Sequence, residues 1–293
     1  MAQWTAEAHV DEALARRLVA VQFPPLPERS LRLLSEGWDY AVFLVDGSLV
    51  FRFPRREVVV PGTAREIAML PRLRLPAPIP RPVHVGQPGD GFPWPFYGAP
   101  YLPGEEAVGL GDEERSRLVR PLARFLRALH ASDLPELPVD PQQRSDMTVR
   151  VPRTRRSLAA IADLWEPPPL VDEVLSAAEA LPPAEPSAVV HGDLHFRQLL
   201  QAGGELTGVI DWVDICRADP GQDLQLLWSF LAPSSRADFL DEYGPVAEGS
   251  LLRARVLALN LNALLARYGH DEGAVAVERE AISALNRTVA GSD

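Results

Sequence analysis

Lysine is absent from this sequence, and cysteine occurs once. All 29 basic residues other than histidine are arginines, so most cationic roles in the protein fall to a guanidinium group. The single cysteine, Cys216, excludes a disulfide within the chain and argues against a cysteine-rich zinc site. The fold therefore rests on a hydrophobic core rather than on covalent cross-links.

Long apolar runs are also missing. No stretch approaches the roughly 18 consecutive apolar residues that predict a membrane-spanning helix. Residues 1–7 have neither a basic region nor an apolar core, and so they do not read as a secretory signal. We therefore expect a cytoplasmic protein without a membrane partner. No sequence feature specifies an oligomeric state.

Acidic residues are concentrated in the later part of the chain. Residues 1–103 carry 11 arginines and 10 acidic residues, a net charge of +1, whereas residues 104–293 carry 18 and 30, a net charge of −12. This balance argues against nucleic acid as the main partner. It would favour a cationic small substrate by long-range attraction, although solvated helix surfaces give the same composition.

The first third of the chain is dominated by strand signals. Val10, Leu14 and Leu18 recur at helical spacing and predict one helix over 9–20, which ends before a proline-rich stretch. The pair Asp46-Gly47 between two apolar runs predicts a two-residue hairpin turn. Strands are expected over 31–34, 41–45 and 48–53, and edge strands over 82–85 and 96–102.

From residue 104 onward the pattern becomes helical. Five large apolar side chains fall on one face of a helix predicted over 112–130. Two short strands interrupt the helices within 189–215. The remaining helices are expected over 156–165, 169–181, 221–230, 235–243, 249–268 and 273–289. The sequence thus predicts an α+β protein with a β-rich N-terminal lobe, 1–103, and a helical C-terminal lobe, 104–293.

Two aspartates follow short apolar runs in the middle of the helical part. Asp193 lies in the His-Gly-Asp-Leu-His segment at 191–195, and Asp211 lies in the Ile-Asp-Trp segment at 210–212. In kinase-type phosphoryl transfer, one aspartate faces the acceptor hydroxyl and a second, on the next strand, holds a metal on the nucleotide. The two segments therefore suggest phosphoryl transfer.

With these two segments the chain resembles the aminoglycoside phosphotransferase and choline kinase-like family, whose fold is protein-kinase-like. Five further segments match the family pattern in the expected order: 37–39, 51–56, 65–70, 101–105 and 219–224. The resemblance implies a bilobal α+β fold with a small β-rich N-lobe and a larger, mostly helical C-lobe. It also implies transfer of the γ-phosphate of ATP or GTP to a small-molecule hydroxyl, with Mg²⁺ on the nucleotide.

The resemblance assigns roles to individual residues. Asp193 would orient or deprotonate the acceptor hydroxyl, and Asp211 would bind Mg²⁺. His191 and His195 would fix the catalytic loop through hydrogen bonds to backbone carbonyls, rather than bind metal. Asp223 would support the same loop, or alternatively interact with the N-terminal dipole of its helix.

Two positions depart from the family pattern. Gln198 stands where the motif usually has asparagine, the second metal ligand; its amide oxygen is still a suitable ligand on a longer side chain. Arg52 occupies the strand position of the phosphate-binding lysine, and a guanidinium can bind phosphate in its place. Its expected partner is Glu66, which could instead complete a capping box with Thr63.

No Gly-x-Gly-x-x-Gly motif precedes the strands, although this motif often covers the nucleotide in kinases. The segment 35–40 takes that place, and we expect Ser35 and Gly37 to contact the nucleotide; an ordinary turn with a buried Trp38 is the alternative. The resemblance places the purine against backbone groups of Ala99, Tyr101 and Leu102. It does not separate ATP from GTP.

Three functional hypotheses follow. The first is a small-molecule kinase whose acceptor is an aminoglycoside, a macrolide, a sugar, an amino alcohol or another metabolite, bound by 133–183 and the helices after 230. Asp238, Asp241 and Glu242 could bind ammonium groups there. The second is a kinase-like module that binds nucleotide or ligand without efficient transfer, and the departures at Gln198 and Arg52 motivate it. A protein acceptor is disfavoured because no activation segment lies between Asp211 and Asp219.

Overall fold

The described chain divides into two compact units. A computed structural model describes residues 6–24, 26, 30–37 and 39–291. The first unit takes the chain up to Leu73 together with 78–103 and 211–213, and the second takes 74–77, 104–210 and the chain from Asp214 onward. The short segment that contains Asp211 thus packs with the N-terminal unit, although its sequence neighbours pack with the other.

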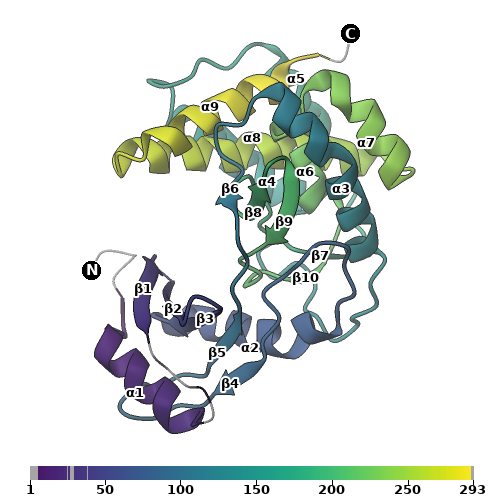
Figure 1. Cartoon of the computed structure of the whole chain (residues 1–293). Coiled ribbons are helices and arrows are strands. Elements are labelled where there is room, and N and C mark those ends of the chain that lie inside the picture. The colour runs from purple at the N-terminus through teal and green to yellow at the C-terminus, as the bar shows by residue number, and fades with distance from the viewer. Residues whose placement is uncertain (1–5, 25, 27–29, 38, 292–293) are drawn as a thin grey trace. The chain divides into compact units, whose positions relative to one another are not determined.

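A five-stranded antiparallel sheet forms the frame of the first unit (Figure 1). The turn between its second and third strands is the predicted hairpin, because Asp46 and Gly47 both have positive φ and the Ser48 amide donates to the Val45 carbonyl. The strand order is β1-β2-β3-β5-β4, with β1 Leu31–Glu36, β2 Tyr40–Val45, β3 Leu49–Pro54, β4 His84–Gly86 and β5 Phe96–Pro100.

The two faces of this sheet differ in character because side chains alternate along each strand. One face carries Phe43, Phe51, Phe53 and Phe96, which pack against helix α1, Glu12–Gln22. The opposite face carries Tyr40, Arg52 and Tyr97, which reach toward helix α2, Val60–Met69. Short 3₁₀ turns, η1 (Glu57–Val59) and η2 (Leu70–Arg72), flank α2. The polar face is therefore available for binding chemistry while the aromatic face forms the core.

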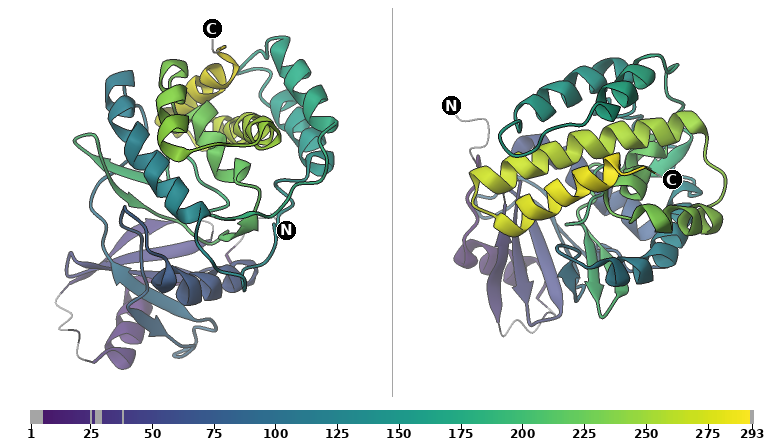
Figure 2. Two further views of the ribbon diagram at one scale, coloured as in Figure 1. Left: turned by 90° about the vertical axis from the view of Figure 1, so that its right-hand side faces the viewer. Right: turned by 90° about the horizontal axis from the view of Figure 1, so that it is seen from above.

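Helices dominate the second unit. The long helix α8, Glu248–Asp271, contacts α4, α5, α6 and α9, and Figure 2 shows α8 and α9 side by side. The predicted apolar face of α3 is buried. The other helices of this unit are α3 Asp112–His130, α4 Met147–Ala159, α5 Leu170–Glu179, α6 Gly221–Ser229, α7 Arg236–Tyr243 and α9 Val275–Val289, with a 3₁₀ turn, η3, at Pro233–Ser235.

Two small antiparallel sheets in the second unit position the predicted motifs. Strand β7, Ala188–Val190, pairs with β10, Cys216–Ala218, and strand β8, Leu199–Ala202, lies between β6, Glu105–Glu106, and β9, Glu205–Val209. The loop 191–198 connects β7 to β8, and the loop 210–215 connects β9 to β10. Both aspartates thus lie in loops that leave short strands, as the motifs predicted.

The α+β class is confirmed, but three local predictions are wrong. Thr63 does not cap a helix, because α2 begins at Val60 with Pro61 in its first turn, and the Thr63 hydroxyl donates to the Val59 carbonyl. The helix expected over 156–165 lies at 147–159, where the Asp146 side chain caps it. Strand β5 is not an edge strand, since it pairs with both β3 and β4.

The central region also contains more strands than expected. Four strands, rather than two, lie between residues 188 and 218. Each of the extra strands is only three residues long, which is too short to give a clear alternating pattern in the sequence. In the described part of the chain, no helix is both long and apolar enough to cross a membrane.

Candidate active site

Arg52 is the centre of a buried ionic cluster in the first unit. Its Nη1 lies 3.2 Å from Oε1 of Glu66, so the expected ion pair is present, and its Nη2 lies 2.9 Å from Oδ1 of Asp211. The guanidinium carbon lies 4.3 Å from the centre of the Tyr40 ring. These contacts hold the planar group in one orientation on the polar face of the sheet.

Glu66 is fully buried on α2 and binds more than one partner. Its Oε1 also accepts hydrogen bonds from the Tyr97 hydroxyl at 3.1 Å and from the Trp212 amide at 3.2 Å. Burial and the nearby charge of Asp211 raise the pKa of Glu66 to about 7, although Arg52 acts in the opposite direction. Arg52 is therefore the main influence that favours the charged form of this carboxylate.

Asp211 adopts a backbone conformation that few residues other than glycine take. Its φ is +66°, in the left-handed region that aspartate tolerates better than most residues. The Trp212 amide donates to Glu66, and the Arg65 side chain donates to the Val213 carbonyl. Two residues of α2, Glu66 and Arg65, thus hold the segment 211–213 through hydrogen bonds to its backbone. The Asp211 carboxylate forms the ion pair with Arg52.

The loop 191–198 in the second unit is fixed by backbone hydrogen bonds. His191 bonds through Nε2 to the Ile210 carbonyl at 2.9 Å, and its Nδ1 accepts from the Asp193 amide at 3.4 Å. Both ring nitrogens of His191 thus bond to the backbone, Nε2 to a carbonyl and Nδ1 to an amide. Gly192 has a φ of +90°, and a Cβ there would lie 2.5 Å from the Asp214 carbonyl oxygen. Only glycine fits at this position.

The side chain of Asp223, on α6, holds this loop in place through hydrogen bonds to two of its amides. Its Oδ2 accepts from the His191 amide at 2.8 Å and its Oδ1 from the Gly192 amide at 3.1 Å. Nε2 of His130 lies 3.1 Å from Oδ2, and Nδ1 of His130 lies 2.6 Å from the Tyr243 hydroxyl. Burial opposes the charge, but the His130 hydrogen bond and both histidines lower the pKa of Asp223 below its ordinary value. The predicted loop-supporting contacts of Asp223 are confirmed.

Asp193 lies beside a guanidinium that the motif does not contain. Oδ1 of Asp193 is 3.2 Å from Nη2 of Arg144, which also lies 2.8 Å from Oδ2 of Asp214. Nη1 of Arg144 donates to the Gly192 carbonyl at 2.6 Å. Although burial opposes its charge, the two aspartates raise the pKa of Arg144 above its ordinary value. Asp193 is thus held as a charged carboxylate that is about one-third exposed.

Gln198 ends the loop with an amide oxygen that has no hydrogen bond. Its backbone bonds to His195 and Ile210, whereas its buried side-chain Oε1 lacks a partner among the described residues. A buried amide oxygen without a partner is costly unless something else binds there. No cluster of three or more His, Cys, Asp or Glu side chains suited to a metal occurs in the described ranges. The oxygens of Gln198 and Asp211 are nevertheless the hard ligands that Mg²⁺ prefers, and that ion commonly takes only one or two carboxylates from a protein.

A family model described as the phosphotransferase enzyme family matches residues 30–257. The chain belongs to this family. The resemblance inferred from the two motifs is thereby confirmed.

Curated relatives agree with this membership. The aminoglycoside 3'-phosphotransferase of Escherichia coli is 29% identical over 156 residues, which cover 49% of this chain and 56% of that protein. The chain therefore matches little more than half the length of that relative. The protein YcbJ of Bacillus subtilis (strain 168) is 28% identical over 240 residues, which cover 72% of this chain and 74% of YcbJ.

Solved structures share the fold of this chain. The GDP complex of wild-type aminoglycoside 2'-phosphotransferase-IIIa aligns over 95% of this chain and 98% of its own, with a TM-score of 0.68 and 20% identity. The macrolide 2'-phosphotransferase of Brachybacterium faecium aligns over 93% and 98%, with a TM-score of 0.60 and 23% identity. These likenesses confirm the predicted kinase-like fold of the family.

Other residues that the sequence predicted for the nucleotide lie in the first unit. Ser35 is exposed at a β-bulge in β1, and the Gly37 amide donates to the Tyr40 carbonyl at 2.9 Å, while Trp38 lies outside the described residues. Ala99 is buried in β5, and the Tyr101 amide after it donates to the Ser48 carbonyl. The Gly37 and Tyr101 amides thus already donate to carbonyls of the protein itself. A nucleotide would therefore have to bind other backbone groups, such as those of Leu102.

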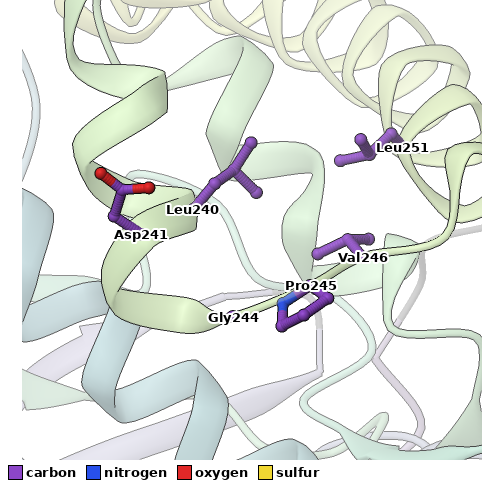
Figure 3. Close-up of a pocket in the computed structure, with 6 residues that line it drawn as sticks. All are labelled: Leu240, Asp241, Gly244, Pro245, Val246 and Leu251. Carbon is purple, nitrogen blue, oxygen red and sulfur yellow. The ribbon is translucent and has the colours of Figure 1, made fainter.

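The carboxylates suggested for ammonium binding lie on α7. Glu242 is engaged by Arg124, at 3.0 Å, and by Arg127, at 3.6 Å, and so its charge is compensated within the protein. Asp241 lies at the edge of a shallow hollow, where Leu240, Val246 and Leu251 face one another (Figure 3). The residues that line this hollow include none from the loop 191–198.

Sequence reasoning missed several residues that the structure places around the two motifs. Arg144 pairs with Asp193, His130 and Tyr243 extend the support of the loop, and Tyr40 stacks on Arg52. None of them lies within a family motif that we recognised in the sequence. Tyr40 alone had a local signal, because it shares a face of the hairpin with Arg52.

Proposed function

We propose that the protein transfers the γ-phosphate of ATP or GTP to a hydroxyl group of a small molecule. Membership of the phosphotransferase enzyme family supports this function. Related proteins carry matching names, among them aminoglycoside 3'-phosphotransferases and a macrolide 2'-phosphotransferase, and related structures were solved with GDP or ADP. The observation that carries the proposal is the Asp193 carboxylate, held charged by Arg144 on a loop fixed through Asp223.

In the proposed reaction, Asp193 orients the acceptor hydroxyl and takes up its proton. The hydroxyl oxygen bonds to the γ-phosphorus while the bond from that phosphorus to the bridging oxygen breaks, and ADP or GDP leaves. Arg52 binds phosphate oxygens in place of the usual lysine, oriented by Glu66 and the Tyr40 ring. Ser35, Gly37, Ala99, Tyr101 and Leu102 remain the predicted nucleotide contacts.

Asp211 and Gln198 are the residues that would hold Mg²⁺. The ion would neutralise charge on the transferring phosphates, which is the larger part of catalysis in this class of reaction. The unpartnered Oε1 of Gln198 supports this assignment, because a cation would satisfy it. The longer side chain of glutamine still offers the same kind of oxygen as asparagine.

A second candidate is a module that binds nucleotide without efficient transfer. The observation that favours it is the ion pair between Arg52 and Asp211, in which a cation of the protein already neutralises the proposed metal ligand. Binding of a magnesium nucleotide would have to displace this contact. The two candidates differ in turnover and agree in nucleotide binding.

One experiment separates them. Purified protein is given Mg-ATP or Mg-GTP with a panel of alcohols (aminoglycosides, macrolides, sugars, amino alcohols), and phosphorylated product is measured by mass spectrometry. Asp193→Asn should retain nucleotide binding, seen as a thermal shift, while turnover falls by about 100-fold or more. Asp133→Asn, at an exposed site in the loop after α3, is the control. Nucleotide binding without product from any alcohol would favour the binding module.

A further inference from the structure

Arg150 on α4 is a buried cation without a counter-ion. The residue is 7% exposed, and the one hydrogen bond of its side chain among the described residues joins Nη2 to the Gln142 carbonyl at 3.4 Å. Its Nε has no partner, and no carboxylate of the described chain forms an ion pair with it. Buried charges in proteins are normally paired. Arg150 therefore retains unused capacity to bind an anion.

Two other guanidinium groups lie near it. Burial first, and then the charges of Arg144 and Arg153, lower the pKa of Arg150 to about 10. Arg153 follows three residues later on the same face of α4, is exposed, and has no ion pair in the described chain. A guanidinium normally stays charged far above this pH, so the protein strongly destabilises this cation in the absence of a ligand.

The carboxylates of this region are already committed. Asp140 accepts from the amides of Arg144 and Ser145, and from the side chain of Gln222. Asp193 and Asp214 share Arg144. Arg150 lies close enough to Asp140 and Asp193 to feel their charge, yet neither is within ion-pair distance of it. The unpaired charge of Arg150 thus lies within electrostatic range of Asp193.

We infer that the acceptor carries an anionic group, a carboxylate or a phosphate, which Arg150 and Arg153 bind while its hydroxyl faces Asp193. This inference rests on the proposed phosphotransfer. A guanidinium group matches both anions through paired N–H donors, and it repels ammonium groups. The local charge at Arg150 and Arg153 therefore favours a different acceptor from the one that the net charge of 104–293 suggests, because interactions at a few ångströms outweigh distant, screened charges.

A matched series of sugars tests the inference. Glucuronate, glucose 6-phosphate, glucose and glucosamine share one ring and differ in charge, and the first two separate a carboxylate from a phosphate. Binding to the full-length protein is measured by saturation-transfer NMR, and turnover is measured separately with Mg-ATP and Mg-GTP. The variants are Arg150→Gln, Arg150→Lys and Arg153→Gln. Arg155→Gln is the control, because Arg155 lies on the opposite side of the helix from Arg153 and pairs with Asp172.

We expect at least one anionic sugar to bind about tenfold or more tightly than glucose, and glucosamine to bind most weakly. Arg150→Gln and Arg153→Gln should remove this preference, Arg150→Lys should keep part of it, and Arg155→Gln should leave it unchanged. Arg153→Gln alters an exposed side chain and keeps the test valid if Arg150→Gln fails to fold.

The outcomes for binding and for turnover are distinguishable. Preference for glucosamine, or equal binding of all four sugars in wild type and variants, would overturn the inference even where an alcohol is phosphorylated. Arginine-dependent binding of an anionic sugar without any phosphorylation would support the inference and contradict the proposed phosphotransfer.

Discussion

Asp193 and Arg144 form an ion pair, and in the proposed reaction the charge of this carboxylate would orient the acceptor hydroxyl. The transition state of phosphoryl transfer is loose, so the acceptor hydroxyl needs orientation more than early deprotonation. A carboxylate fixed by a guanidinium is a suitable acceptor for one hydrogen bond in a defined direction. Arg144 also bonds to Gly192 and Asp214, and so it joins the two loops that follow β7 and β9.

Glu66 is the residue whose charge should change within the physiological pH range. Burial raises its pKa from 4.5 to about 7 in the folded protein. The folded state therefore binds one more proton than the unfolded state between these two values. The contribution of Glu66 to the free energy of unfolding therefore falls as pH rises through this window, and it stays constant above about pH 8 and below about pH 4.

Replacing Glu66 by glutamine should remove this pH dependence. Between pH 5 and 8 the wild type should lose on the order of 3 kcal/mol more stability than Glu66→Gln, measured by urea unfolding without nucleotide. Glu57→Gln, at an exposed site before α2, is the control and should follow the wild type. A wild type that gained stability over this range relative to Glu66→Gln would contradict the assignment.

At the level of elements, helices α3, α6 and α7 are joined to the loop 191–198 by one chain of hydrogen bonds. Tyr243 of α7 contacts His130 of α3, which contacts Asp223 of α6, and Asp223 accepts the amides of His191 and Gly192. Both oxygens of Asp223 are acceptors for N–H donors. A neutral side chain with one N–H₂ group cannot satisfy the same set.

Asp223→Asn should therefore disturb the loop rather than only remove a charge. One buried donor of the loop or of His130 would lose its acceptor, which should cost about 2–3 kcal/mol of stability. Turnover should fall more than nucleotide binding does. Tyr243→Phe is the matched variant, because it removes only the outermost hydrogen bond and should cost about 1 kcal/mol. Equal effects of both variants, measured by denaturation and steady-state kinetics, would contradict this account.

The sequence predicts elements where the signal is local and fails where tertiary contacts decide. Helix α3 carries its own apolar stripe, and the β2–β3 turn carries Asp46-Gly47, so both were predicted correctly. Thr63 and Glu66 have capping-box spacing, yet both are buried inside α2, where Tyr40 and Arg52 bind them. The motifs named Asp193 and Asp211, but Arg144 comes from a distant segment and only folding brings it to Asp193.

For the whole molecule, the positions of the charged residues matter more than the net charge of the chain. The chain carries a net charge of −11 and the whole of that excess lies after residue 103, yet Asp193 pairs with Arg144 and interacts electrostatically with Arg150. Many of the acidic residues are on solvated helix faces or, like Glu242, are paired with arginine. Net charge therefore describes solubility and long-range attraction, whereas in the proposed function the residues close to Asp193 would determine which acceptor binds.

Glu280 links the start of the second unit to its last helix. Its two oxygens lie 2.9 and 2.8 Å from Nη2 of Arg115 on α3, and Arg287 and the Gly109 amide bind the same carboxylate. Glu280 and Arg115 are each almost fully buried. This cluster holds α9 against the chain segment that leads into α3.

Glu280→Gln should weaken this junction strongly. Removing the carboxylate charge leaves the buried guanidinium of Arg115 uncompensated, which should cost about 3–5 kcal/mol. Amide hydrogen exchange, followed by mass spectrometry, should then accelerate most in α3 and α9. Glu242→Gln is the control, because that carboxylate forms exposed ion pairs with Arg124 and Arg127, and its loss should leave exchange unchanged. If amides in α3 and α9 of Glu280→Gln exchanged at the same rates as in the wild type, apolar packing alone would be shown to hold α9 in place.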